Sequence, residues 1–251
     1  MSRQEPRQIV SRRGRPAKPP LSRDVIVATA LDLLARDGLS ALSLRKVAAT
    51  LDTGPASLYV YVANLAELHA LMLDRALGAV ALPAAREGEW RDRLRAVLAS
   101  YFRVLYDGPG LAQLALSTIP AGPHALRLGE TVLALLLEGG VEPGVAAWAF
   151  DLLTLHVAAV AAEQSVRRGQ GDTFGPVTQA IAAAPAEDYP HIHALRAELL
   201  SGGDARFGWV LDVLIDGVLH APDLPSATTD AARVPVISLA QGPLAQGESD
   251  Q

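Results

Sequence analysis

Hydrophobic and polar positions alternate with a helical period along almost the whole chain. Apolar residues recur at spacings of three and four, and aromatic and β-branched strand formers are scarce. This pattern predicts an all-α protein. The expected helices cover residues 23–36, 44–51, 55–62, 65–81, 90–106, 111–117, 125–138, 143–168, 192–200 and 204–220. The Gly- and Pro-rich stretch 169–190 is expected to be a loop with one helical turn at most.

The segment 44–68 carries the most informative local pattern. Two short amphipathic helices flank a tight junction at Asp52-Thr53-Gly54. Pro55 suits the first position of the second helix, because its missing N–H would have no partner there. Such a pair is the helix-turn-helix arrangement, whose second helix enters the DNA major groove, and the alternative is an ordinary pair of packed helices. The apolar faces consist of Leu44, Val47, Ala48 and Leu51 in the first helix, and of Leu58 and Val62 in the second.

Capping residues mark three helix starts. Ser22 is placed to cap the helix that begins at residue 23, and Ser43 to cap the next one, through hydroxyl oxygens that accept backbone N–H groups. Asn64, with Glu67 three residues later, has the form of a capping box and opens the fourth helix.

Composition limits the possible classes of protein. The 251 residues suffice for one large domain, or for a small domain and a larger one. No uncharged run approaches the roughly 20 residues of a membrane span, and no apolar segment directly follows the basic N-terminal residues as in a secretory signal. The sequence has no cysteine, which excludes disulfides and thiolate metal sites. We therefore expect a cytoplasmic protein without a membrane partner.

The net charge of −5 is unevenly distributed. Residues 1–21 carry +5, residues 22–68 carry −1 and the remainder carries −9. A basic arm ahead of an acidic body indicates binding to a polyanion. Within the arm, Arg13-Gly14-Arg15-Pro16 resembles the AT-hook, in which two extended arginines enter a narrow minor groove. The alternative is a solvated flexible tail, and the arm can be both.

Motifs for catalysis are missing from the sequence. It has no cysteine nucleophile, no G-x-S-x-G elbow, no H-E-x-x-H and no Gly-rich phosphate loop after a strand. His191-x-His193 lies in a Pro-rich stretch and lacks a third ligand of firm spacing. We expect no enzymatic activity, no metal site and no cofactor. Two alternatives to a gene regulator are an architectural DNA-binding protein and an all-helical small-molecule-binding protein without DNA activity.

The N-terminal helices resemble the DNA-binding domain of TetR-family repressors. The resemblance rests on RKVAATL, on ASLYVYV with Leu58, Tyr59 and Tyr61, and on the run after Asn64. Farther along, the order Trp90…Leu94-Arg95, LALSTIP, a helix ending in Gly-Gly and a long helix ending in AAEQ is similar in layout to the tetracycline repressor subgroup. The resemblance covers about residues 22–220 and implies a DNA-binding regulator that responds to a ligand.

The same resemblance implies a homodimer joined by a four-helix bundle, here built from residues 144–168 and 204–220 of each subunit. Each of these helices has an apolar stripe. The alternative is that both stripes pack inside the core of one subunit. The stripes consist of Val145, Trp148, Ala149, Leu152, Leu155 and Ala159, and of Phe207, Val210, Leu211, Leu214 and Val218.

The expected DNA contacts follow from side-chain chemistry. Arg45 is able to hold guanine O6 and N7 bidentately, and Lys46 is a phosphate contact or a solvated charge. The hydroxyl-bearing residues reach phosphates, as do the N–H groups at the helix start by Asn64. Leu65 and Asp52 depart from the family's phosphate-binding lysine and turn glycine, and the arm compensates. The expected DNA-binding residues are Arg13, Arg15, Arg45, Lys46, Pro55, Ser57, Tyr59, Tyr61 and Asn64.

The resemblance also implies a pocket for a small-molecule effector in the body. The magnesium-coordinating histidine of the tetracycline repressor subgroup falls at Ala115, and Ala76-Leu77 follows Asp74-Arg75 where that subgroup has a second histidine. This disfavours a tetracycline–magnesium chelate and favours a mostly apolar ligand with a few polar groups. The expected lining residues are Tyr101, Leu105, Thr118, Leu128, Thr131, Phe150, Asp151, Thr154 and His156, with His124 nearby.

The resulting organisation has four parts. We expect a basic flexible arm (1–21), a helix-turn-helix DNA-binding domain (22–68), an effector-binding and dimerisation domain (69–221) and a disordered tail (222–251). The partners are a pseudo-palindromic operator in double-stranded DNA, a small-molecule effector and a second copy of the chain. Effector binding is expected to tilt the fourth helix and lower DNA affinity.

Overall fold

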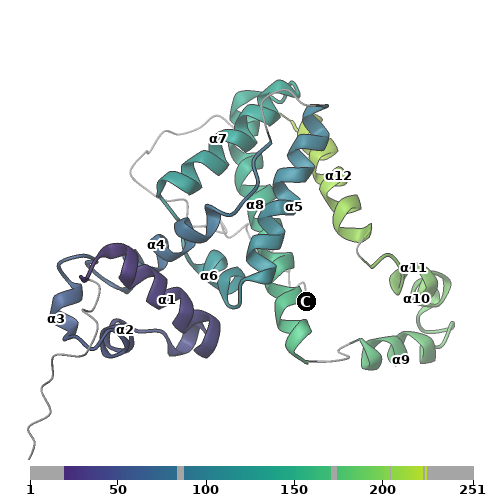
Figure 1. Cartoon of the computed structure of the whole chain (residues 1–251). Coiled ribbons are helices and arrows are strands. Elements are labelled where there is room, and N and C mark those ends of the chain that lie inside the picture. Colours follow the sequence, from purple (N-terminus) through teal and green to yellow (C-terminus); the bar gives the residue numbers. More distant parts are fainter. Residues whose placement is uncertain (1–19, 84–87, 171–173, 204, 223, 225–251) are drawn as a thin grey trace, which may run out of the picture. The chain divides into compact units, whose positions relative to one another are not determined.

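The computed structural model describes residues 20–83, 88–170, 174–203, 205–222 and 224 (Figure 1). Within these ranges the chain forms twelve α-helices and one 3₁₀ turn, and no strand. The prediction of an all-α protein is confirmed. Residues 1–19 of the basic arm, which include Arg13 and Arg15, lie outside the described residues, as does nearly all of the tail.

The helices follow one another along the chain with short connections. They are α1 (Arg23–Asp37), α2 (Leu44–Thr50), α3 (Pro55–Leu58), α4 (Leu65–Leu77), α5 (Trp90–Asp107), α6 (Leu111–Ser117), α7 (Pro123–Glu138), α8 (Pro143–Gln170), α9 (Gly175–Ala183), α10 (Pro190–Ala194), α11 (Arg196–Leu199) and α12 (Ala205–Leu219), with the 3₁₀ turn at Leu39–Ala41 between α1 and α2.

All three predicted caps are present. The Ser22 hydroxyl accepts the N–H of Val25 at 3.3 Å, and the Ser43 hydroxyl accepts the N–H of Lys46 at 3.2 Å. The Asn64 side chain accepts the N–H of Glu67 at 2.8 Å. The Glu67 carboxylate reaches the N–H of Ala63, one residue before the position expected for a capping box. These bonds satisfy donors that the helix itself leaves open, and they fix where each helix begins.

Helix α8 is the core of the body. It packs against α5, α6, α7 and α12, and residues such as Leu153 and Val157 are fully enclosed. Leu98 of α5 and Leu136 of α7, two of the helices that pack against α8, are fully enclosed as well. Among the described residues, α8 is also the one helix long and apolar enough to cross a membrane. Because α8 packs against four other helices, its apolar composition is that of a core helix.

The expectations for the region 169–200 were wrong in two places. Residues 175–183, expected in a loop, form α9, because Pro176 stands in the first turn and the Ala-rich stretch after it favours helix. The expected single helix 192–200 is divided into α10 and α11 at Leu195 (φ −104°, ψ 15°). Neither piece has a buried face, so no packing holds a longer helix together.

Candidate DNA-binding head and effector cavity

Helices α1, α2 and α3 form a small head around a closed apolar core. Ile26 and Leu34 of α1 are fully enclosed there, as are Val47 of α2 and Leu58 of α3. Val62, just beyond α3, is buried too, and its N–H donates to the carbonyl of Leu58. The apolar faces predicted for the two short helices therefore point inward, and their polar faces are left for a partner.

The turn between α2 and α3 is a Schellman motif. The N–H of Thr53 donates to the carbonyl of Ala48 at 3.0 Å, and the N–H of Asp52 donates to the carbonyl of Ala49 at 3.1 Å. Asp52 has a φ of +52° and is the only non-glycine residue with positive φ in the described part of the chain. This conformation is the reason that a glycine is usual at such a position.

The outer face of α2 and α3 presents the side chains expected to meet DNA. Arg45 is exposed, Tyr59 is 58% exposed, and Ser57 and Tyr61 are half-buried. Pro55 opens α3 as predicted. Val60, 81% exposed, was not among the predicted residues, although its place between two outward-facing tyrosines could have indicated it. Its methyl groups suit contact with a thymine methyl.

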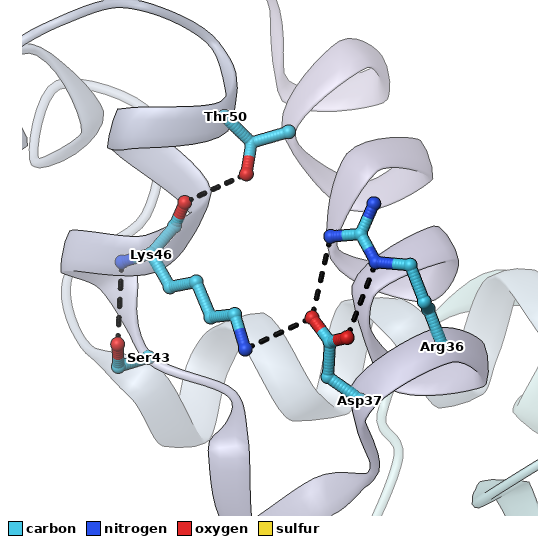
Figure 2. A network of polar contacts seen from close by, with 5 residues as sticks. All are labelled: Arg36, Asp37, Ser43, Lys46 and Thr50. Carbon is cyan, nitrogen blue, oxygen red and sulfur yellow. Dashed lines mark hydrogen bonds and ion pairs between the residues drawn. The ribbon is translucent and has the colours of Figure 1, made fainter.

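Lys46 is held by an ion pair within the head. Its Nζ lies 2.9 Å from Oδ2 of Asp37, whose carboxylate also accepts from Arg36 at 3.2 Å (Figure 2). The hydrogen bond from Arg36, followed by that from Lys46, lowers the pKa of Asp37 to about 2. Asp37 therefore ties the end of α1 to the start of α2. A phosphate contact by Lys46 would compete with this pair.

Asn64 has a similar internal role. Its side-chain oxygen caps α4. A phosphate could therefore be bound by the amide nitrogen of Asn64 or by the backbone N–H groups at the start of α4. The backbone next to it is fixed as well, because Arg23 of α1 donates to the carbonyl of Tyr61 at 3.2 Å.

The body contains a partly open cavity of about 670 Å³. Its walls come from α4 to α8, and its lining is mostly apolar. Six of the nine expected residues line it: Tyr101, Thr118, Leu128, Phe150, Asp151 and Thr154. Leu105, Thr131 and His156 lie outside the lining, and Leu105 is fully enclosed in the core. Ala115, where the resemblance implied that a metal-binding histidine is missing, lines the cavity with a methyl group.

Sequence reasoning missed the contribution of α4. Leu73 and Leu77, one turn apart, line the cavity together with Leu126 and Leu133 of α7 and Leu155 of α8. The sequence shows their helical spacing, but it does not show which neighbouring helices or cavity they face. A more open hollow of about 760 Å³ lies against α6, α8 and Phe174, and α4 does not contribute to it. The cavity next to α4 is therefore the one in contact with the helix that leads into the head.

Polar groups in the cavity are few and well placed for orientation. Burial raises the pKa of Tyr101 to about 12, so its phenol keeps its proton at physiological pH. Thr118 is half-buried, and Asp151 stands at an exposed part of the lining. The Thr154 hydroxyl donates to the carbonyl of Phe150 at 2.8 Å and thereby leaves its oxygen able to accept. A mostly apolar molecule with a few hydrogen-bonding groups suits this lining.

The predicted stripe of α8 is divided between an inner and an outer face, whereas every residue of the predicted α12 stripe is buried or half-buried. Val145 and Ala149 of α8 are buried in the subunit's own core, as are Leu211 and Val218 of α12. On the outer face, Trp148, Leu152 and Leu155 of α8 are exposed, and so are Trp209 and Val213 of α12. These last two were not predicted. We call Trp148, Leu152, Trp209 and Val213 the outer apolar face; Leu155 lies between this face and the cavity, which it lines.

The family model described as tetracyclin repressor-like, C-terminal domain, matches residues 82–221, more than half of the chain. The chain belongs to the TetR family of transcriptional regulators. An HTH-type transcriptional regulator of Saccharopolyspora erythraea is 37% identical over 69% of this chain and 74% of that protein. The repressor DrrR1 of Streptomyces coeruleorubidus is 31% identical over 82% of this chain and 80% of the relative. This TetR-family chain is thus a transcriptional regulator of the repressor type.

Solved structures agree with this assignment. The TetR family protein ActR of Streptomyces coelicolor, in complex with actinorhodin, has a TM-score of 0.72 to this chain. The two are 36% identical, and the similarity covers 80% of this chain and 96% of ActR. The head and body are therefore those of a TetR-family regulator.

Proposed function

We propose that this chain acts in the cytoplasm as a homodimeric repressor that a small, mostly apolar molecule releases from a pseudo-palindromic operator. One observation carries the proposal: Leu73 and Leu77 of α4 line the body's cavity, and α4 packs on α1 of the head. A ligand that fits the cavity better in one position of α4 than in another must shift the head toward that position.

The outer apolar face supports the dimer. Trp148 and Trp209 are 59% and 66% exposed, which is unusual for side chains of this size. Val213 and the open position of Gly217, one turn later, leave room for a second helix to approach closely. Exposed apolar side chains on two helices that pack against each other, as α8 and α12 do, are typical of a dimer interface.

The head supports sequence-specific binding. We assign base readout to Arg45 and to apolar contact by Val60, and phosphate contact to Ser57, Tyr59 and Tyr61. Arg13 and Arg15 of the arm are assigned to A·T-rich minor grooves beside the operator. Two heads related by dimer symmetry place these contacts in successive major grooves.

Actinorhodin is the first effector to test, because ActR has been solved in complex with it. A pool of random DNA duplexes would first be selected on the full-length protein to obtain the operator. Fluorescence anisotropy of that operator would then be followed while actinorhodin is added.

The proposal predicts a palindromic motif and a loss of anisotropy on saturation. A Leu73→Trp variant, which fills the cavity from α4, should keep operator binding and lose the response. Absence of an enriched motif would contradict operator binding, and an unaltered response in the Leu73→Trp variant would contradict the cavity as the effector site.

A further inference from the structure

A buried carboxylate on α4 holds the first turn of α7. Asp74 is only 7% exposed, and its Oδ1 accepts the N–H of His124 at 3.0 Å and the N–H of Ala125 at 2.8 Å. Among the described residues no cation forms an ion pair with Asp74, so the open N–H groups and the dipole of α7 compensate its charge. The cap residue of α7 is Gly122, which has no side chain to do this. Asp74 therefore caps α7 from another helix, and we call this contact the Asp74 clasp.

Two glycines make room for the clasp. A Cβ on Gly122 would lie 2.2 Å from Cγ of Asp74, a distance that no side chain could occupy without displacing the carboxylate. A Cβ on Gly78, at the end of α4, would lie 3.0 Å from Cε1 of His124. The end of α4 and the start of α7 are thus in contact over a full helical turn, with no space for an extra methyl group at Gly122.

The same turn of α4 contacts the cavity and the head. Leu73 and Leu77 on either side of Asp74 line the cavity, and so does Ala125, whose N–H the clasp uses. Arg75, the next residue, forms an ion pair with Asp24 of α1 at 3.6 Å. The clasp therefore lies where the cavity wall, the connecting helix and the DNA-binding head meet.

We propose that Asp74 is the positioning residue that couples the cavity to the head, by fixing α4 to the first turn of α7. The inference rests on the proposed release of DNA by a ligand. A ligand that moves α7 carries α4 with it only while the clasp is closed. Without the clasp, α4 keeps only its direct contact with the ligand through Leu73 and Leu77, and the influence of ligand binding on DNA binding is reduced.

The first test needs no effector. Because the chain has no cysteine, spin labels are introduced by Ala35→Cys in α1 and Ala134→Cys in α7, both at exposed positions, and the labelled chain is diluted with unlabelled chain. Double electron–electron resonance gives the distribution of distances between the two spin labels, one in the head and one in the body. Asp74→Ala should broaden it, and Asp74→Asn, which keeps an acceptor oxygen, should restore most of the original width. A distribution of unchanged width in the Asp74→Ala variant overturns the proposal.

The second test measures coupling, with the selected operator and actinorhodin as probes. For each variant the operator Kd is measured without and with saturating actinorhodin, and the ligand Kd is measured without DNA. Asp74→Ala and Gly122→Ala should both still bind the operator and actinorhodin. The operator Kd with actinorhodin, divided by the operator Kd without it, should be at least tenfold smaller than in the wild type and close to one. The double variant should be no worse than either single variant, because both open the same contact.

Asp32→Asn, which removes an exposed carboxylate from α1, is the matched control and should leave the ratio unchanged. If the ratio of operator Kd values in both Asp74→Ala and Gly122→Ala equals that of the wild type, the role of Asp74 is refuted. If the wild-type chain itself shows no release by actinorhodin, the choice of effector fails, and the distance measurement decides on the clasp. Should Asp74→Ala not fold, Gly122→Ala serves as the variant with an open clasp in both tests, and Asp74→Asn as the variant that keeps it.

Discussion

Substitution of Trp209 by alanine should disrupt the dimer without unfolding the subunit. A tryptophan buries about 150–250 Å² at an interface, and 66% of Trp209 is exposed, so about 130 Å² is available for the partner to cover. At about 25 cal/mol per Å², this corresponds to about 3 kcal/mol for each copy. Both copies are lost in a homodimer, which gives about 4–6 kcal/mol after allowing for the alanine methyl group, within the range of interface hot spots. The dimer Kd should therefore rise by three to four powers of ten, since each 1.4 kcal/mol is about tenfold.

Sedimentation equilibrium over a wide concentration range measures this Kd directly. Leu137→Ala is the control, because Leu137 is 48% exposed on α7 and belongs neither to the outer apolar face nor to the cavity lining, and its loss should leave the Kd unaltered. The helical signal in circular dichroism should be the same in both variants. A dimer Kd within a factor of ten of the wild-type value for Trp209→Ala would refute α12 as part of the interface.

Four further predictions concern the head and the arm. Arg45→Ala should relax base preference at one operator position at a cost of about 1–3 kcal/mol, checked by repeating the DNA selection. Asp52→Gly should raise the free energy of unfolding by about 0.5–1 kcal/mol in urea titrations, because it relieves the positive φ. Since the folded pKa of Asp37 is about 2, below the ordinary 3.8, its contribution to stability is present above pH 3.8 and is lost as the pH falls toward 2. In thermal melts at decreasing pH, the Asp37→Asn variant should therefore lose less stability between pH 3.8 and 2 than the wild type. Deletion of residues 1–18 should weaken operator binding and flatten its salt dependence, and an unchanged slope would make the arm a passive tail.

Local chemistry explains which parts of the fold were predictable. Ser22, Ser43 and Asn64 each act on a backbone N–H three residues away, so their caps were visible in the sequence and are present in the structure. The same holds for the inward faces of α2 and α3. The region of α9 to α11 was predicted less well, because its helices have no buried face and the Gly and Pro residues near Pro176 were taken as breaks.

The cavity shows where reasoning from layout ends. Alignment by layout identified the correct helices, but not the rotation of each helix about its axis. Thr154 and Phe150 of α8 line the cavity, while His156, two residues away from Thr154, does not. Thr131 of α7 misses it in the same way beside Leu128. The Asp74 clasp was out of reach for a different reason: it joins residues 50 positions apart, and no short motif announces such a contact.

The charges of the head explain why the arm should matter for affinity. Residues 22–68 carry −1 overall, and one of the four cations, Lys46, is held by Asp37 inside the head. Arg23 is likewise engaged with the carbonyl of Tyr61, which leaves Arg45 and Arg36 facing outward, and Arg36 pairs with Asp37. A head with so little uncompensated positive charge gains little from the release of counterions, which supplies most non-specific affinity for DNA. Asp37→Asn should release Lys46 from its ion pair and raise both the affinity for DNA and its salt dependence. In the wild type, the charge of +5 on residues 1–21 can supply such phosphate contacts from outside the head. Affinity and base selection are therefore assigned to different parts of this chain, the arm and α2–α3.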